Sequence, residues 1–382
     1  VNTDASGVRT CTITATATGS KTLTIGTPTQ LNTLTASVTF VAQTPSAIYS
    51  TFTCTASSNV NANGVTNSTC TLTVRDTSNV IMAGVATTAS ITTGATGATT
   101  TCGTSVNTDA SGVRTCTINA TTAGSRVLTV SAPTQLNTMT ATVGFVTPVV
   151  STANSSFACT GTPVANGVQY GTCTITVKDT DNVAISGTAA SFSVTSGTST
   201  TISNCSTAAN TDTNGQRNCQ VKSTTVETKT LTTSSPAFSP AKTATLAFSA
   251  QVPSATTSTF SCTPTTGVAA DGSSTSTCTM TVKDSDSVAI SGTAAYFSAS
   301  PSTGVASACL TTGNTDANGQ RACTVTSTSS GTKTFTMVAP TQLTSFTATV
   351  AYVGAPSATY STLSCSPTGP TIPTGSSASS PC

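Results

Sequence analysis

Hydrophobic and polar residues alternate in short runs along the whole chain, and this alternation is its clearest structural signal. In the run 70–74, Cys70, Leu72 and Val74 alternate with two threonines. A period of two places the apolar side chains on one face of a β-strand and the hydroxyls on the other. Threonine suits the outer face because its branched Cβ fits a pleated backbone. Since no segment shows a convincing helical period, the pattern predicts an all-β chain.

Residues 45–147 show how many strands one unit of the pattern contains. Stretches rich in Gly, Asn and Asp, such as 59–67, 75–79 and 107–112, interrupt the alternation and predict turns. Short strands at this density are typical of an antiparallel β-sandwich with seven strands. The strands are expected at 52–54, 70–74, 84–93, around Cys102, 114–118, 124–131 and 138–146.

Cysteine positions show that this unit is repeated along the chain. Cys54, Cys159, Cys262 and Cys365 recur at intervals of about 104 residues, and the other cysteines follow the same interval. A fixed interval of this length predicts a tandem array of small domains, and we expect a segment of a longer repetitive chain. The expected organisation is the C-terminal part of a repeat at 1–44, complete repeats at 45–147, 148–252 and 253–355, and the N-terminal part of a further repeat at 356–382.

Short turn motifs recur together with the cysteines. Val-Lys-Asp-Thr-Asp-Asn at 177–182 returns as Val-Lys-Asp-Ser-Asp-Ser at 282–287, and the eight residues after it are repeated unchanged. Asn-Thr-Asp-Thr-Asn-Gly-Gln-Arg at 210–217 returns at 314–321 with one change. This pattern resembles the bacterial Ig-like repeats of the invasin and intimin type (the Big-1 family), although four cysteines per repeat depart from the usual family pattern. The resemblance implies an extracellular spacer built of tandem Ig-like β-sandwiches, commonly found in adhesin stalks.

The four cysteines of each repeat indicate two disulfide bonds and an oxidising, extracellular compartment. Four cysteines allow three pairings. In the strand order A-B-E-D of an Ig-type sandwich, only bonds A–B and D–E join neighbours and leave no cysteine beyond the roughly 7 Å Cα limit. The expected disulfides are Cys54–Cys70, Cys102–Cys116, Cys159–Cys173, Cys205–Cys219, Cys262–Cys278, Cys309–Cys323 and Cys365–Cys382.

Cys11 has no partner in this scheme. Residues 1–13 are identical to residues 106–118, so Cys11 corresponds to Cys116. Its partner is therefore expected before Val1, in the other half of the same repeat. The alternative is a reactive free thiol.

Composition argues against several classes of function. Charged residues make up 6% of the chain and the net charge is +2, which gives no electrostatic reason to bind nucleic acid or an anionic membrane. The chain has no His, which removes the usual zinc and haem ligand sets and the Ser-His-Asp triad. No C-x-x-C motif, paired-carboxylate site or apolar run of bilayer length can be found. We therefore expect a non-enzymatic protein with no cofactor, no metal and no membrane insertion in this segment.

Aspartates in the repeated turns are candidates for a metal site. Asp179 with Asp181, and Asp284 with Asp286, could chelate calcium together with backbone carbonyls. The alternative is that Asp serves the turn itself, because its side chain accepts hydrogen bonds from nearby backbone amides. The position of Asp181 is Ser78 in the repeat before it, which favours the turn interpretation.

An arginine lies two residues before a cysteine in each repeat, at the start of a strand. We expect these arginines to pair with turn aspartates such as Asp109, Asp212 and Asp316 rather than to recognise a ligand. They are Arg9, Arg114, Arg217 and Arg321.

The boundaries between repeats are short, and each contains a proline, which restricts the backbone. Consecutive sandwiches are therefore expected to stack as a rod with limited bending. An aromatic residue precedes each boundary and is expected in a core, with packing between repeats as the alternative. These aromatic residues are Phe40, Phe145, Phe248 and Tyr352.

A disulfide-stabilised rod indicates a structural role at the cell surface or in a secreted filament. The alternative is the stalk of a cell-surface adhesin or invasin that displays a binding tip outside this chain. Expected partners are other copies of the chain or neighbouring repeats, and the many exposed hydroxyls are candidates for attached glycans. A carbohydrate- or receptor-binding module would need a cluster of exposed aromatic residues, and aromatic residues make up only 4% of the chain.

Overall fold

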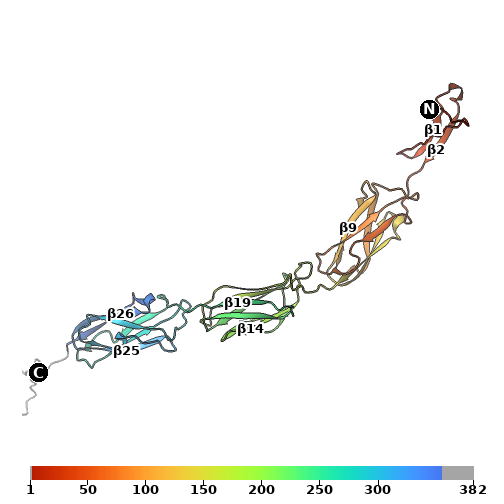
Figure 1. Ribbon diagram of the computed structural model, residues 1–382. Coiled ribbons are helices and arrows are strands. Elements are labelled where there is room, and N and C mark those ends of the chain that lie inside the picture. Colours follow the sequence, from red (N-terminus) through yellow and green to blue (C-terminus); the bar gives the residue numbers. More distant parts are fainter. Residues whose placement is uncertain (1, 355–382) are drawn as a thin grey trace, which may run out of the picture.

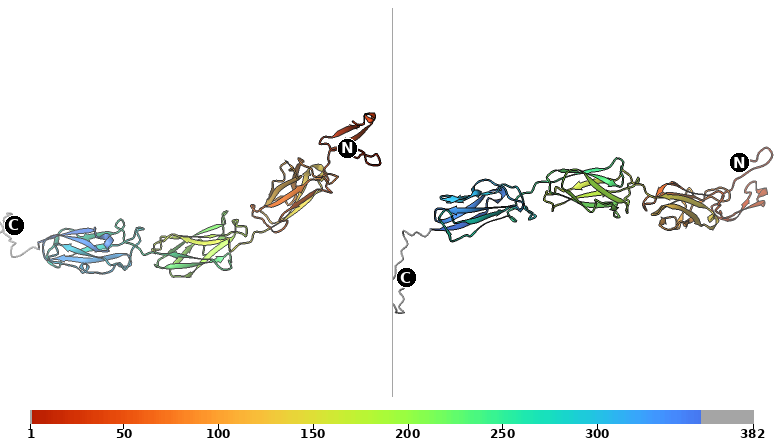
Figure 2. Two further views of the ribbon diagram at one scale, coloured as in Figure 1. Left: turned by 45° about the horizontal axis from the view of Figure 1, so that its top comes forward. Right: turned by 90° about the horizontal axis from the view of Figure 1, so that it is seen from below.

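The computed structural model describes residues 2–354, and strands form nearly all of the regular structure in that range. Three complete sandwiches follow one another end to end, with a two-stranded hairpin at the N-terminal end (Figure 1). Two further views show the same elongated, gently curved arrangement (Figure 2). The expected all-β architecture of tandem Ig-like sandwiches is confirmed. No helix within residues 2–354 has the length and apolarity needed to cross a bilayer.

Two sheets form the repeat that covers residues 45–147. Their strand orders are β3-β5-β9-β7 and β4-β11-β10-β6-β8. The first corresponds to the A-B-E-D order on which the disulfide prediction depends. The strands are β3 (Thr51–Cys54), β4 (Val60–Asn61), β5 (Ser68–Thr73), β6 (Ala86–Thr93), β7 (Ala98–Thr100), β8 (Val106–Asn107), β9 (Val113–Ala120), β10 (Gly124–Ala132) and β11 (Thr140–Val146).

Three details of this repeat differ from the sequence-based expectation of seven strands. The two-residue strand β8 was not expected, and it pairs antiparallel with β6. The stretch 59–67, expected as a turn, contains β4, which pairs in parallel with β11. A strand of two residues is too short to show alternation, so the pattern could not reveal it. Cys102 lies in a turn just after β7 rather than within a strand.

The next two repeats keep the same plan. Residues 148–252 have sheets β12-β13-β17-β15 and β16-β14-β18-β19, and residues 253–354 have β20-β22-β25-β24 and β21-β27-β26-β23. The strands are β12 (Ser156–Thr160), β13 (Gly171–Thr176), β14 (Ala189–Ser196), β15 (Thr200–Ser203), β16 (Ala209–Asn210), β17 (Gln216–Ser223), β18 (Thr228–Ser235), β19 (Thr243–Ala247), β20 (Thr259–Thr263), β21 (Val268–Ala269), β22 (Ser276–Thr281), β23 (Tyr296–Ser300), β24 (Val305–Ala306), β25 (Gln320–Ser327), β26 (Gly331–Ala339) and β27 (Thr347–Val353).

The N-terminal hairpin pairs β1 (Gly19–Thr24) with β2 (Thr35–Phe40) and has no facing sheet in the described part of the chain. Val38 is 38% exposed there, whereas its equivalent Val143 is fully buried. Four short 3-10 turns complete the regular structure of residues 2–354: η1 (Thr29–Leu31), η2 (Thr134–Leu136), η3 (Ala308–Leu310) and η4 (Thr341–Leu343).

Each complete repeat has its own hydrophobic core, and none of the three core clusters extends across a boundary. The aromatic residues before the boundaries belong to these cores, since Phe145, Phe248 and Tyr352 are each 3% exposed. The alternative, aromatic packing between repeats, is therefore not observed at these three positions. The three cores are therefore separate, and side-chain hydrogen bonds such as those from Asn63 and Asn166 connect consecutive repeats.

Candidate functional site at the junctions between repeats

Six disulfide bonds cross-link the described residues, two in each complete repeat. They join neighbouring parts of one sheet, as the A-B-E-D order requires. Cys70 lies opposite both Cys54 and Cys116 in the strand register, yet it bonds to Cys54, and Cys116 bonds to Cys102. The pairs are those expected from the sequence: Cys54–Cys70, Cys102–Cys116, Cys159–Cys173, Cys205–Cys219, Cys262–Cys278 and Cys309–Cys323.

The remaining cysteines lie towards the two ends of the chain. Cys11 is exposed and forms no disulfide within residues 2–354. Its expected partner precedes Val1, and that pairing stays a prediction. The expected Cys365–Cys382 bond and the expected partial repeat at 356–382 lie outside the described residues.

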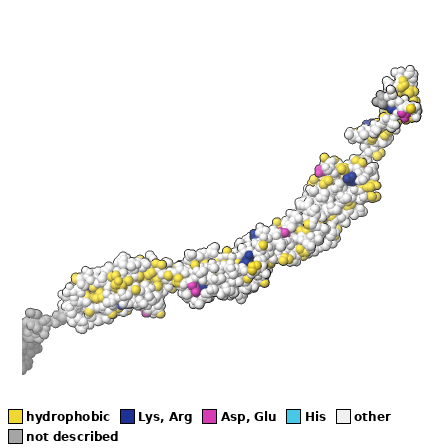
Figure 3. Space-filling view, viewed as in Figure 1, with side chains coloured by type: hydrophobic (Ala, Val, Ile, Leu, Met, Phe, Trp, Pro, Cys, Tyr) yellow, Lys and Arg dark blue, Asp and Glu magenta, His cyan; other side chains and the backbone are white. Residues whose placement is uncertain are grey.

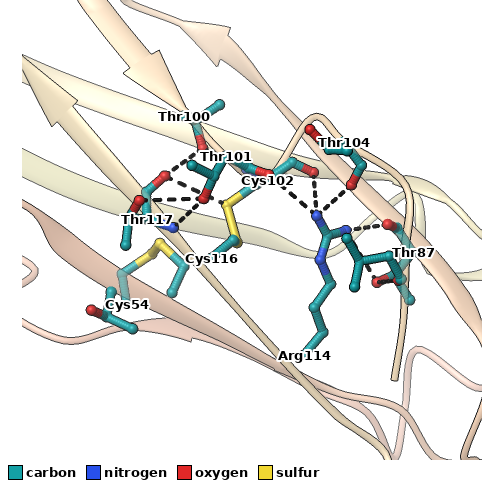
Figure 4. The surroundings of a disulfide bond; sticks show 12 residues. Cys54, Thr87, Thr100, Thr101, Cys102, Thr104, Arg114, Cys116 and Thr117 are labelled. Carbon is teal, nitrogen blue, oxygen red and sulfur yellow. Dashed lines mark hydrogen bonds between the residues drawn. A yellow bond between two sulfur atoms is a disulfide. The ribbon is translucent and has the colours of Figure 1, made fainter. Parts of the chain in front are cut away.

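Arg114 binds backbone carbonyls beside a disulfide, not an aspartate (Figure 4). The residue is 5% exposed, and its guanidinium donates to the carbonyl oxygens of Cys102, at 3.0 Å, of Thr87 and of Thr104. Because Arg114 is on β9 and Thr87 is on β6, the side chain joins the two sheets of the sandwich. Burial lowers the pKa of Arg114 from its usual value.

The expected pairing of the arginines with turn aspartates is therefore wrong. Asp109 uses its carboxylate within its own turn, where Oδ1 accepts from the backbone amides of Ser111 at 2.8 Å and Val113 at 2.9 Å. Arg217 and Arg321 also donate to backbone carbonyls, and Arg9 is exposed in the N-terminal segment. Five donors in a rigid fork suit several carbonyls better than one carboxylate already in use. Within residues 2–354, the ion pair found is Lys229–Glu227.

Another aspartate of each repeat shapes the turn that faces the preceding repeat. In Asp179, Oδ1 accepts from the backbone amides of Asp181 and Val183, each at 2.9 Å. Asp284 binds the amides of Asp286 and Val288 in the same way, at 3.0 and 2.9 Å. One carboxylate oxygen is therefore committed to the local turn, as expected for Asp in such a position.

The other oxygen of the same carboxylate contacts the preceding repeat. Asn63 donates from Nδ2 to Oδ2 of Asp179 at 2.7 Å, and Asn166 donates to Oδ2 of Asp284 at 2.8 Å. At the latter junction, the linker residue Gln251 also donates to Asp284, at 3.1 Å. The same aspartate thus stabilises its own turn through Oδ1 and accepts a hydrogen bond from the preceding repeat through Oδ2.

In the first complete repeat, the equivalent aspartate is Asp76, and its side-chain donor comes from the linker. Gln43 donates to Oδ2 of Asp76 at 3.0 Å. The linker after Phe145 is two residues shorter and has no glutamine, and there Asn63 reaches the equivalent Asp179. Each of the three turns therefore has an amide donor on Oδ2, although the donor differs.

A second aspartate extends the contact at two junctions. Asp181 accepts from Asn61 at 2.6 Å and from Thr66 at 2.9 Å. The next junction repeats the arrangement, with Asp286 accepting from Asn166 at 2.9 Å and Gln169 at 2.6 Å. At each of these two junctions, two carboxylates face the preceding repeat. Asp181, Asp284 and Asp286 each accept from two side chains of the preceding repeat or linker, and Asp179 accepts from one.

Local structure presets the donor amides. Asn63 uses Oδ1 to accept from the backbone amides of Val65 and Thr66, at 3.0 and 2.8 Å, so its Nδ2 is left for the next repeat. Asn166 makes the same turn. The following residues, Gly64 and Gly167, have φ of +76° and +73°, a conformation that favours glycine. The turn thereby fixes which end of the amide faces outward.

These carboxylates are buried without a basic partner. Asp179 is 0% exposed and Asp284 is 2% exposed. A buried charge is tolerated only when hydrogen bonds replace its hydration. Burial raises the pKa of Asp284, but hydrogen bonds from Asn166, Gln251 and two backbone amides outweigh it, so the pKa lies below its usual value. In Asp76 the pKa is also lowered, chiefly by the backbone amide of Val80.

The calcium alternative finds no support in this geometry. Within residues 2–354, no cluster of three metal-ligating side chains occurs. The N–H groups of Asn63 and Asn166 point their positive ends at the carboxylate oxygens that a cation would use. The Asp-rich turns therefore serve as contact surfaces between repeats.

The last complete repeat carries a different residue at the donor position. Asp271 replaces Asn63 and Asn166, and its Oδ1 accepts from the backbone amides of Ser273 at 2.8 Å and Ser274 at 2.6 Å. These amides hold the pKa of Asp271 well below its usual range. A carboxylate has no N–H to donate. The C-terminal end of the last complete repeat therefore presents acceptors at Asp271, where the other two complete repeats present the donors Asn63 and Asn166.

Sequence reasoning identified the acceptor aspartates but not the donors. Their signal was available, because Ala-Asn-Gly-Val occurs at 62–65 and again at 165–168. It could not be interpreted without the structure, since donor and acceptor are more than 100 residues apart in the chain.

No protein-family model and no curated protein matches the chain. Among solved structures, it is similar to invasin, described as a bacterial integrin-binding protein, with 23% identity over 83% of this chain and a TM-score of 0.45. It is also similar to FdeC, an adhesin of Escherichia coli, with 22% identity over 82% of this chain, 100% of that chain and a TM-score of 0.33. The D0-D1 domain of intimin shows 27% identity over 52% of this chain, 96% of that chain and a TM-score of 0.23.

The present chain spans 61% of the length of the invasin structure. Invasin and intimin are the type of protein whose repeats the turn motifs of this chain resemble.

Proposed function

We propose that this chain is a non-enzymatic, extracellular rod in which neighbouring repeats are held in line by amide–carboxylate hydrogen bonds. The observation that carries the proposal is the contact of Asn63 with Asp179 and of Asn166 with Asp284. The same pair of positions joins consecutive repeats at both of these junctions. A repeated joint is what a spacer of defined length requires.

The chemistry of the joint favours limited bending rather than free rotation. Separating two repeats would leave Asp179 or Asp284 to be rehydrated, and each hydrogen bond to a charged group contributes about 1.5–3 kcal/mol. Several such bonds at one joint restrain its direction, and the short proline-containing linker restrains its length.

The surface suits an extracellular spacer that does not bind charged partners. Figure 3 shows one face of the molecule, on which charged side chains are few and widely spread. Two disulfides per repeat suit an oxidising environment. We place the protein at the cell surface or in a secreted filament, with other copies or neighbouring repeats as its partners.

A rod can act as a filament or as the stalk of an adhesin with a tip outside this chain. Negative-stain microscopy of purified protein separates the two. Long uniform fibres support the filament, and single rods that do not associate support the stalk. Compact particles, or chains bent at random between repeats, would contradict both.

A further inference from the structure

The repeat at 148–252 has a groove that the role of a spacer does not explain. It lies on the outer face of the sheet β12-β13-β17-β15 and has a volume of about 440 Å³. Its lining consists of Tyr170, Thr172, Asn204, Asn218, Cys219 and Gln220. No charged side chain belongs to the lining.

Three adjacent strands bring these side chains together. The register places Thr172 opposite Gln220 on β13 and β17, and Ser203 opposite Gln220 on β15 and β17. Asn204 follows β15 directly. Tyr170 precedes β13 and is 51% exposed. Since Cys173 and Cys219 are buried, the alternating residues Thr172, Asn218 and Gln220 face outward.

The other complete repeats lack this set of side chains. At the positions of Tyr170, Asn204, Asn218 and Gln220, they carry mainly threonine or alanine. Asn204 has φ of +69°, a conformation that favours Asn, so the backbone accounts for that residue. Asn218 lies within β17, where Asn is a poor strand former compared with Thr, so strand stability gives no reason for that exchange. The equivalents are Asn67, Thr101, Thr115 and Thr117 in one repeat and Thr275, Ala308, Ala322 and Thr324 in the other.

We propose that this groove binds a neutral oligosaccharide. Sugar hydroxyls donate and accept hydrogen bonds, and the amides of Asn204, Asn218 and Gln220 offer both functions. Asn218 already accepts from Thr174 at 2.6 Å through Oδ1, which fixes the amide and leaves Nδ2 as a donor. The groove lacks the cluster of exposed aromatic residues expected of a carbohydrate-binding module, so the amides supply most of the contacts. The ring of Tyr170, the one aromatic residue of the lining, adds an apolar face for sugar C–H groups beside a polar hydroxyl. The uncharged lining favours neutral over acidic sugars.

Saturation-transfer NMR on the whole chain tests this proposal. The protein is made without glycosylation, because Asn204-Cys205-Ser206 is an acceptor sequence for N-linked sugar. The probes are cellotetraose, mannotetraose and chitotetraose. At least one should receive saturation with a Kd on the order of 1 mM, as expected for a shallow site. No transfer to any of the three would overturn the proposal.

Two exchanges taken from the neighbouring repeats locate the site without risking the fold. Tyr170→Asn and Gln220→Thr introduce residues that the repeat at 45–147 carries at the same positions. Each should weaken binding about tenfold, the loss of one good contact. Tyr49→Ala, which removes a 44% exposed tyrosine in another repeat, should leave it unchanged. Unchanged affinity in Tyr170→Asn, or equal loss in Tyr49→Ala, contradicts the site.

Discussion

The side-chain amide of Asn166 lies 2.8 Å from a carboxylate oxygen of Asp284, a residue 118 positions away in the next repeat. The other oxygen of Asp284 closes its own turn through the amides of Asp286 and Val288. One aspartate thus stabilises its own turn and also helps to fix the orientation of one repeat relative to the next. The equivalent pair Asn63 and Asp179 makes the same link one repeat earlier.

Removing this amide should loosen one joint and leave the others intact. Asn166→Ala deprives Asp284 and Asp286 of one donor each, and water replaces it only in part. We expect the repeat at 253–354 to lose about 1–2 kcal/mol of unfolding free energy and the two repeats to reorient more freely. Chemical denaturation and small-angle scattering measure these two effects.

Two further variants control this experiment. Asn166→Asp copies the residue found at Asp271 and sets a third carboxylate against two others, so it should loosen the joint more than alanine does. Asn214→Ala changes an exposed turn residue at the opposite end of the same repeat and should leave the orientation of the repeats at 148–252 and 253–354 unchanged. Equal behaviour of all three variants would show that the amide does not hold the joint.

Acid should open the joint at a predictable pH. Because hydrogen bonds lower the pKa of Asp284 below its ordinary value of 3.8, the charged carboxylate stabilises the junction fully above that value. This contribution is lost as the pH falls through the lower folded-state pKa. Scattering should therefore report an extended chain at neutral pH and a more flexible one well below pH 3.8.

The variant Asp284→Asn checks the origin of this pH dependence. It replaces the acceptor Oδ2 with a donor that faces the donor Nδ2 of Asn166. The joint should then be loose at neutral pH too and should change little on acidification. A wild-type pH response retained in this variant would assign the effect to another group.

Arginine at position 114 should not be replaceable by lysine. Lysine carries a point charge that cannot reach the carbonyls of Thr87, Cys102 and Thr104 together. Arg114→Lys should lower the unfolding free energy of the repeat at 45–147 by about 1–3 kcal/mol, since buried carbonyls lose their donors. Arg75→Lys, at a half-buried turn residue that donates to the carbonyl of Asn79, is the control and should change it little.

Reduction should destabilise all three complete repeats. Each disulfide closes a loop with a sequence separation of 14 or 16, and a bond of this kind contributes about 3 kcal/mol. Calorimetry with and without a thiol reductant measures the shift in Tm. Alkylation followed by intact-mass measurement should find all twelve bonded cysteines of residues 2–354 protected. An unchanged Tm would mean that the bonds do not stabilise the repeats.

Strands and cysteines were predictable because their signals are local or periodic. The alternation around Cys70, Leu72 and Val74 marks β5, and the cysteine interval marks the repeat. The two-residue strand β4 was missed because it has no period. The partner of Arg114 was missed because opposite charge suggested Asp109, whereas that carboxylate is occupied by its own turn.

The joint itself could not be predicted for a different reason. A hydrogen bond from Asn166 to Asp284 depends on how two separately folded units meet, and no local pattern encodes that. The sequence identified the aspartates of these turns and offered calcium or turn formation as their role. Their contact with the preceding repeat can be seen only in the three-dimensional structure, which shows the linker and the two repeat ends that meet there.

Small-angle scattering of the whole chain in increasing salt tests the central claim most directly. The joints use neutral amides as donors to carboxylates rather than ion pairs, so screening by about 1 M salt should leave them closed. The account predicts one extended form in which the complete repeats follow one another end to end, as in Figure 1, and whose maximum dimension does not shorten with salt. A shorter maximum dimension with a broad distribution of shapes, at low or high salt, would contradict it.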